Sequence, residues 1–128
     1  MGEFPFKVYL YFIFRVLVGG LFFMHGAQKL FGWFGASGTV ELVSLIGLAG
    51  IIEFAGGLLI VLGLFTRYVA MITAAEMLVA FFKAHFPQGW NPLLNSGELS
   101  LLYFSAFLVL IVLGARMWSL DRVFFDKR

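Results

Sequence analysis

Four long apolar runs, separated by short polar or glycine-rich breaks, dominate the chain. They cover roughly residues 7–30, 40–65, 68–86 and 99–117. Each run approaches or exceeds the ~20 residues that a helix needs to cross a bilayer. The runs are continuous rather than alternating, which argues against membrane strands. The pattern therefore predicts an all-α integral membrane protein, a four-helix bundle that forms one domain.

The segments between and after the runs have the residues of turns and caps. Gly and Ser residues fill the break at 32–38, and Pro and Gly residues mark a longer loop at 87–97. Asn95 and Glu98 have the spacing of a capping box for the fourth helix. The last segment, 119–128, mixes apolar and charged residues and predicts a short amphipathic helix at the membrane interface.

Composition agrees with a membrane protein and excludes several kinds of chemistry. The 128 residues are 62% hydrophobic and 12% charged, whereas soluble proteins are about 25% charged. The formal net charge is only +2, and no basic run lies outside the C-terminal tail. We therefore expect the lipid bilayer, not a nucleic acid, as a partner. The chain has no cysteine, which excludes disulfides, thiolate metal sites and iron–sulfur clusters held by this chain.

The distribution of basic residues predicts an orientation. One side of the predicted bundle carries Lys7, Arg67, Arg116, Arg122, Lys127 and Arg128, and the other carries Lys29 and Lys83. The positive-inside rule then places both termini of a multi-pass cell-membrane protein in the cytoplasm. Trp33 and Trp90 fall at the outer interface and Trp118 at the inner one, as expected of an aromatic belt.

Three charges fall inside different apolar runs: Arg15, Glu53 and Glu76. A charge at the bilayer centre costs about 2.5–3.5 kcal/mol on insertion scales, so a partner is required. At a rise of ~1.5 Å per residue, all three lie in one layer near the middle of the membrane. We expect Arg15 to contact Glu53, Glu76 or both. The contact is either a structural ion pair that sets helix register or part of a functional pocket.

A second polar layer lies nearer the outer face and contains His25, Lys29, Lys83, His85 and Glu98. Titratable groups rarely gather in a membrane bundle without a function. We therefore predict an outer cavity lined by His25, Lys29, Glu53, His85 and Glu98, with Trp33 or Trp90 near its mouth. The simpler alternatives are that Lys29 and Lys83 extend to the headgroups and that Glu98 only caps a helix.

The predicted cavity suits a quinone-like head group, which needs hydrogen-bonding groups close to apolar and aromatic walls. We assign catalytic roles to His25, Glu53 and Glu98. Of these, His25 is the proposed proton relay, because an imidazole can pass a proton near neutral pH. The predicted ligand-binding residues are Arg15, Lys29, Glu76, His85, Trp33 and Trp90. No metal site is assigned. Haem held by His25 and His85, or a metal held by these two and Glu98, is a less favoured alternative, since no other feature supports it.

The order and spacing of motifs along the chain are distinctive. They are Arg15, His25-Gly26-x-x-Lys29, Glu53-x-x-Gly56-Gly57, Gly63-x-x-Thr66-Arg67, His85, Asn95-x-Gly97-Glu98 and Ser119-Leu120-Asp121. Together they resemble the DoxX family of membrane proteins over nearly the whole chain. That family often has Gly-Pro-Gly near the end of the last span, where this chain has Gly114-Ala115-Arg116. We therefore expect the last helix to continue through this segment.

The resemblance implies a four-helix membrane bundle and suggests redox chemistry. Relatives in that family include a subunit of thiosulfate:quinone oxidoreductase, and others are linked to membrane complexes with superoxide dismutase and a sulfurtransferase. By that resemblance, the chain is expected to be a quinone-binding membrane subunit of an oxidoreductase complex. A soluble or membrane-bound redox partner would then supply the electrons. The alternatives are a small transporter or channel, preferably a homo-oligomer, and a structural or assembly scaffold.

Overall fold

The regular structure is entirely helical in a computed structural model that describes residues 6–36 and 38–125. The helices are α1 (Phe6–Phe31), α2 (Leu45–Leu62), α3 (Thr66–Ala80), α4 (Glu98–Leu113) and α5 (Leu120–Phe124). A π-helical turn (Phe81–His85) and a 3-10 turn (Phe86–Gln88) continue α3. No strand occurs within the described ranges, so the all-α prediction is confirmed.

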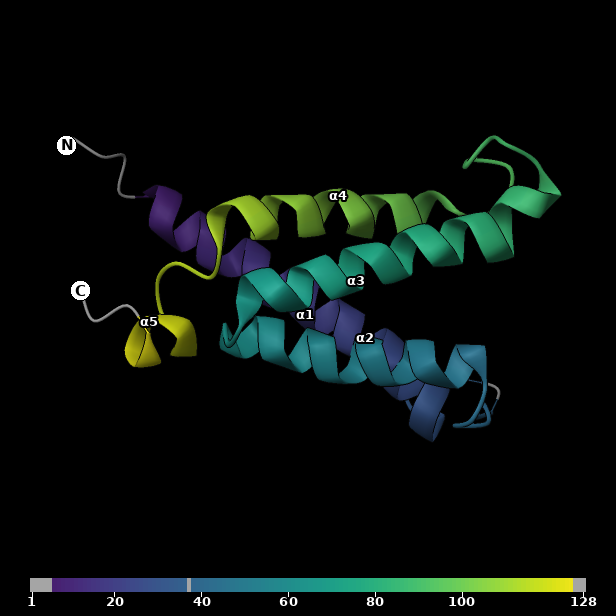
Figure 1. Cartoon of the computed structure of the whole chain (residues 1–128), viewed down its shortest axis with the longest axis horizontal. Helices are drawn as coiled ribbons and strands as arrows, with labels where there is room; N and C mark the ends of the chain where they lie inside the picture. The colour runs from purple at the N-terminus through teal and green to yellow at the C-terminus, as the bar shows by residue number, and fades with distance from the viewer. Residues whose placement is uncertain (1–5, 37, 126–128) are drawn as a thin grey trace.

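Three helical stretches are long and apolar enough to cross a bilayer: Phe6–Phe31, Leu45–Leu62 and Thr66–Gln88. The fourth, α4, is equally apolar but has only 16 residues. It lies beside α3 along most of its length (Figure 1). Large apolar side chains such as Leu17 and Val112 lie on the outside of the helices, as in a protein whose solvent is lipid.

The helices α1 and α2 pack against each other with their backbones in close approach. A Cβ atom added to Gly57 would lie 2.4 Å from the backbone nitrogen of Phe23, and one added to Gly26 would lie 2.2 Å from that of Phe54. Only glycine fits at such positions, and small residues are the usual means of close helix packing in lipid. The close approach of α1 and α2 therefore depends on glycine at these positions.

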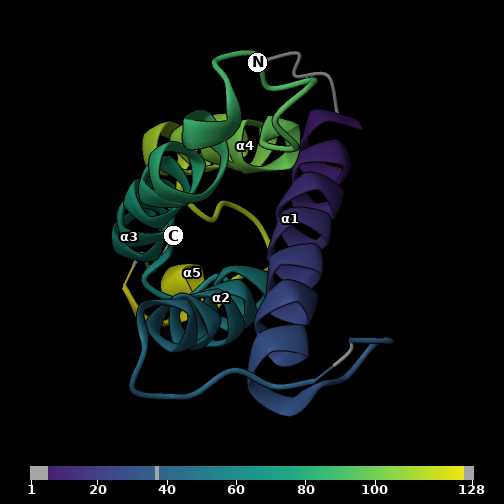
Figure 2. The ribbon, with the colours of Figure 1, turned by 90° about the vertical axis from the view of Figure 1, so that its right-hand side faces the viewer.

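The helices form two pairs, α1 with α2 and α3 with α4 (Figure 2). The two pairs meet in an aromatic core. The ring of Phe22 lies 4.8 Å from that of Phe107 and 5.1 Å from that of Tyr103, measured between centroids. Met77 of α3 belongs to the same buried cluster. This core divides the interior of the bundle into two ends, and each end contains a cavity.

The end of α4 differs from the prediction. The helix was expected to continue to about residue 117, but it ends at Leu113. Gly114, Arg116 and Trp118 all have left-handed backbone conformations, with φ of 73°, 64° and 54°. This irregular segment then leads into α5, whose first turn is capped by the Ser119 hydroxyl. Residues 126–128 of the predicted amphipathic helix lie outside the described residues.

Arg15 explains why the helix ends there. Its side chain is fully buried and donates five hydrogen bonds of 2.7–3.1 Å to backbone carbonyls. The acceptors are the carbonyl oxygens of Ile60, Val61, Ala115, Met117 and Trp118. The last carbonyls of a helix lack intrahelical partners and carry partial negative charge, so they suit a guanidinium. A continuous α4 would use its carbonyls internally, because each would accept from an amide further along the helix.

The predicted contact of Arg15 with Glu53 or Glu76 is therefore wrong. The antiparallel register of α1 and α2 places Arg15 beside the last turn of α2. It places Lys29, at the other end of α1, beside Glu53. Arg15 consequently lies at the opposite end of the bundle from the two carboxylates and takes no part in a pocket with them.

Candidate functional site

A cavity of about 790 Å³ lies between α2 and α3, with residues of α1 and α4 at its back. Figure 1 shows α2 and α3 diverging toward the end where α2 begins, which is the end that holds this cavity. Most of the wall is apolar, with Ile46, Ile72, Val79 and Leu99 among its residues. The polar residues of the wall are His25, Lys29, Glu53, Glu76, Lys83, His85, Ser96, Ser100 and Tyr103.

An ion pair between Lys29 and Glu53 forms the polar centre of the cavity wall. Lys29 Nζ lies 2.5 Å from Glu53 Oε1, and the side chain of Glu53 is only 3% exposed. Lys29 therefore points to a carboxylate rather than to the headgroups. Burying such a pair costs solvation energy that good geometry only partly recovers, so its stabilising effect on the fold is small. The pair holds a charged donor and a charged acceptor on the surface of an apolar cavity.

Glu76 adds a second carboxyl group next to the Lys29–Glu53 ion pair. It interacts electrostatically with both Glu53 and Lys29. Its Oε1 atom is buried and has no hydrogen-bond partner. Two carboxylates and one ammonium would leave one net negative charge in a low-dielectric environment, where like charges repel strongly. The cluster therefore has room for one more positive charge, either a bound proton or a cationic group.

His25 lies next to this cluster, one helical turn before Lys29. It is half-buried, and its ring meets the edge of Tyr103 at a centroid distance of 5.8 Å. Its ring lies close enough to Glu53 and Lys29 to interact electrostatically with both charges. Within the described part of the chain neither ring nitrogen makes a hydrogen bond. Both nitrogens are thus available to a ligand in the cavity.

His85 lines the same cavity but is held by the loop that follows it. Its Nδ1 lies 3.1 Å from the backbone oxygen of Asn95. Because a carbonyl can only accept, Nδ1 carries the hydrogen, and Nε2 is left for other partners. Asn95 is itself buried and donates to the Gly89 carbonyl while accepting from the Gly97 amide. This network fixes the loop over one edge of the cavity.

Glu98 does not line the cavity, contrary to the prediction. It is exposed, and α4 begins with it after Gly97, so Asn95 is not the N-cap residue. The residues of α4 that meet the cavity are Leu99, Ser100 and Tyr103, at helical spacing, and Ser96 lies in the loop just before the helix. Sequence reasoning missed these residues, although their helical spacing was a signal that could have identified them.

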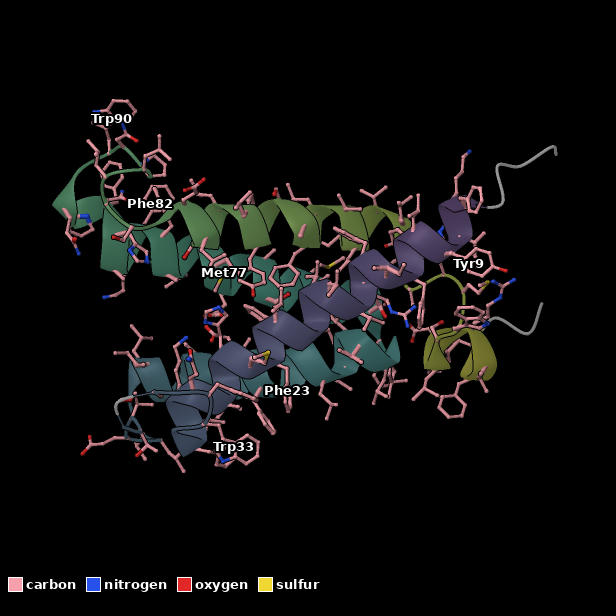
Figure 3. The ribbon with its side chains drawn as sticks, turned by 180° about the vertical axis from the view of Figure 1, so that it is seen from behind. Tyr9, Phe23, Trp33, Met77, Phe82 and Trp90 are labelled. Carbon is pink, nitrogen blue, oxygen red and sulfur yellow. The ribbon has the colours of Figure 1, made fainter. Side chains whose placement is uncertain are left out.

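The two tryptophans predicted at the mouth also lie elsewhere. Trp33 packs on Phe31 with a centroid distance of 4.9 Å, and Trp90 is 74% exposed in the loop after α3. Figure 3 shows them at separate corners of the molecule, far from Met77, which lines the cavity. The chain turns outward before each of them, at Gly32 and Gly89, where φ is positive.

The alternative metal site from His25, His85 and Glu98 does not form. In residues 6–36 and 38–125 no three His, Asp or Glu side chains lie close enough together to hold a metal ion. The exposed position of Glu98 is the physical reason, because it removes one of the three proposed ligands from the cavity.

Comparisons with known proteins place this geometry in a family. The family model named DoxX matches residues 10–86, which is more than half of the chain. The chain belongs to the DoxX family. The matched region contains Arg15 and every charged or histidine residue of the cavity wall. No solved structure matches the chain significantly.

Three bacterial relatives cover nearly the whole chain. An uncharacterized protein of Haemophilus influenzae is 37% identical over 95% of this chain and 96% of its own length. "Inner membrane protein YqjF" of Escherichia coli is 34% identical, over 88% of this chain and 90% of its own. "Putative oxidoreductase CatD" of Bacillus subtilis is 29% identical, over 89% and 86%. With its apolar helices, this DoxX-family chain is a membrane protein.

Proposed function

We propose that this DoxX-family protein is the membrane subunit of an oxidoreductase and binds a quinone in the cavity between α2 and α3. The observation that carries the proposal is the charged Lys29–Glu53 pair, with Glu76 and His25 beside it, in a cavity whose other walls are mostly apolar. A lipid-soluble ring with polar oxygens matches that distribution. The volume of about 790 Å³ lies within the range of about 300–1,000 Å³ that is common for small-molecule sites.

The polar wall has the groups that quinone reduction requires. A quinone takes up two electrons and two protons, one proton at each ring oxygen, to become a quinol. The ammonium of Lys29 can donate a hydrogen bond to one ring oxygen and offset negative charge that develops there. His25 and Glu76 can each hold and transfer a proton, and neither is committed to another hydrogen bond at the atoms concerned.

The electrons must come from outside this chain. With no cysteine, it cannot ligate an iron–sulfur cluster. A partner subunit or soluble protein that carries a redox group would therefore deliver them. The name of the Bacillus subtilis relative, "Putative oxidoreductase CatD", supports a redox role.

A small cation or proton transporter is the second candidate, and the buried Oε1 atom of Glu76, which has no hydrogen-bond partner, favours it. The buried core argues against a continuous path. Phe107 and Ile60 have no exposed surface, and Arg15 closes the other end of the bundle with its five hydrogen bonds. A purely structural scaffold would not explain why the Oε1 atom of Glu76 is buried without a hydrogen-bond partner.

Binding of a short-chain quinone, menadione, to the purified full-length protein in nanodiscs tests the proposal. Glu76→Gln keeps the ion pair and the side-chain shape, so folding is preserved. We expect it to weaken binding, and we expect His25→Ala to raise the dissociation constant about tenfold, as the loss of one hydrogen bond to a charged or polar group would. The control is Glu98→Gln, which removes an exposed charge outside the cavity.

Equal affinity for menadione in the wild-type, His25→Ala and Glu76→Gln proteins would remove these residues from the site. Absence of quinone binding together with proton or cation flux into vesicles, lost in Glu76→Gln, would favour the transporter. A visible and ultraviolet spectrum of the lipids extracted from the purified protein would show whether a native quinone accompanies it.

A further inference from the structure

A second cavity, of about 870 Å³, lies at the opposite end of the bundle and shares no lining residue with the first. The α2–α3 turn, the irregular segment after α4 and the short helix α5 form its walls. In Figure 1 this is the end where α1 begins and where α5 lies. The positive-inside rule predicts that this end faces the cytoplasm.

The walls of this cavity carry three arginines: Arg67, Arg116 and Arg122. All three are exposed, and none forms an ion pair with a carboxylate in the described part of the chain. The cavity has one carboxylate, that of Asp121. It accepts hydrogen bonds from the Phe65 and Thr66 amides, at 2.6 and 2.9 Å, and so caps the start of α3. The charge balance of the cavity is therefore strongly positive.

A buried hydroxyl without a partner lies in the same wall. Thr66 has no exposed surface, it lines the cavity, and its Oγ1 makes no hydrogen bond. A buried polar group that lacks a partner lowers stability, so such groups are rare unless a ligand or water completes them. An oxygen-rich ligand in the cavity would complete this one by accepting from the hydroxyl.

Gly114 lets one of the arginines approach the end of α4. Its φ of 73° is in the left-handed region, and an added Cβ atom would lie 2.9 Å from Arg67 Nε. The guanidinium of Arg67 therefore lies against the backbone at the end of α4. This placement puts the exposed Arg67 side chain in the wall of the cavity.

We propose that this cavity binds a phosphate group, and that the phosphate belongs to the headgroup of an anionic phospholipid. Guanidinium groups bind phosphate oxygens with matched, often bidentate geometry. Basic clusters next to membrane helices attract anionic lipids. Phe65, Tyr68 and Phe125 also line the cavity and offer the apolar surface on which glycerol and acyl chains can lie.

The test is binding of a fluorescent phosphatidylglycerol to the purified full-length protein in a neutral detergent. Unlabelled phosphatidylglycerol, phosphatidylcholine and inorganic phosphate serve as separate competitors. We expect phosphatidylglycerol to compete well and phosphatidylcholine poorly. Arg67→Gln and Arg122→Gln should each weaken binding about fivefold, the effect of one basic residue near an anionic surface. The matched control is Lys7→Gln, which removes one exposed charge at the same end of the bundle without touching the cavity.

The Thr66→Val variant tests whether the Thr66 hydroxyl binds the ligand or is only buried in the fold. Without lipid, the variant should unfold at the same temperature as the wild type or a higher one, because it removes an unpartnered polar group. Its affinity for phosphatidylglycerol should fall, because the hydrogen bond to the phosphate is lost.

The proposal is overturned if phosphatidylglycerol and phosphatidylcholine compete equally, or if both arginine variants bind the lipid as Lys7→Gln does. Unchanged lipid affinity in Thr66→Val would likewise exclude the hydroxyl from the site. If inorganic phosphate binds and the labelled lipid does not, the cavity recognises a soluble phosphate rather than a headgroup.

Discussion

Arg15 and Glu53 are both buried charges, but they are stabilised in different ways. Arg15 is neutralised by backbone dipoles, through five hydrogen bonds to carbonyls, and needs no carboxylate. Glu53 has a charged partner, Lys29, and a second carboxyl group nearby. The first arrangement is fully committed to holding the fold. The second leaves unfilled hydrogen-bonding capacity on a cavity wall, which is what a binding site requires.

Replacing Arg15 by Met should destabilise the protein by at least about 3 kcal/mol, because several buried carbonyls lose charge-assisted bonds of about 1.5–3 kcal/mol each. Arg15→Lys should fall between Arg15→Met and the wild type, since lysine has three donors and no planar fork. Thermal unfolding in detergent measures both, with Lys7→Met as an exposed control. An Arg15→Met protein as stable as that control would contradict the assignment.

For the pair in the first cavity, Lys29→Met should cost about 3–5 kcal/mol, because it leaves Glu53 buried without a partner. The double variant Lys29→Met, Glu53→Gln should recover part of that loss. A double-mutant cycle based on unfolding measures the coupling energy between the two residues. Additive effects of the two single changes would show that the ion pair does not form in the membrane.

The close contact between α1 and α2 depends on glycine at defined positions, and α4 depends on its irregular end. At ~1.5 Å per residue, the 16 residues of α4 reach about 24 Å, less than the ~30 Å hydrocarbon core. Backbone that is not helical is tolerated at membrane depth only where protein satisfies its polar groups. Arg15 does so for the carbonyls of Ala115, Met117 and Trp118.

Gly57→Ala should destabilise the bundle by about 1–3 kcal/mol, the usual cost of overpacking, because its Cβ would collide with the backbone of Phe23. The matched control is Gly20→Ala, also within a helix, where an added Cβ meets no atom within 4 Å. That change should be neutral or stabilising by about 0.5–1 kcal/mol, since alanine favours a helix. Equal unfolding temperatures for the two variants would mean that α1 and α2 do not approach as described.

The whole molecule has two different ends. One end holds the cavity with the Lys29–Glu53 pair, and the other holds the arginine-lined cavity that Asp121 and α5 help to form. The aromatic core around Phe22 and Phe107 separates them. An oxidoreductase subunit of this form would exchange quinone at one membrane face and contact anionic lipid at the other.

The orientation of these ends can be tested directly because the chain has no cysteine. Trp90→Cys should react with a membrane-impermeant maleimide in intact cells, and Lys7→Cys should react only after the cells are opened. Both residues are exposed, so a cysteine that fails to react is protected by the membrane and not by burial within the protein. Labelling of Lys7→Cys from outside would reverse the predicted topology.

The helices, their apolar character and the family were evident from the sequence. A run of about 20 apolar residues is a local property, and so is the stripe that carries His25 and Lys29 along one face of α1. The placement of His25, Lys29, Glu53 and His85 around one cavity followed from counting residues along the helices. Their roles as ligand-binding and catalytic residues remain predictions.

The tertiary structure decided the partners of the charges and the end of α4. Counting along a helix gives an approximate height in the membrane, but it does not give the register between helices, which here depends on the glycine contacts of α1 and α2. The acceptors of Arg15 are backbone carbonyls, which every residue carries, so no residue type in the sequence marks them. The face of α4 that meets the cavity likewise depends on the turn at Ser96 and Gly97, whose conformation only the packed loop determines.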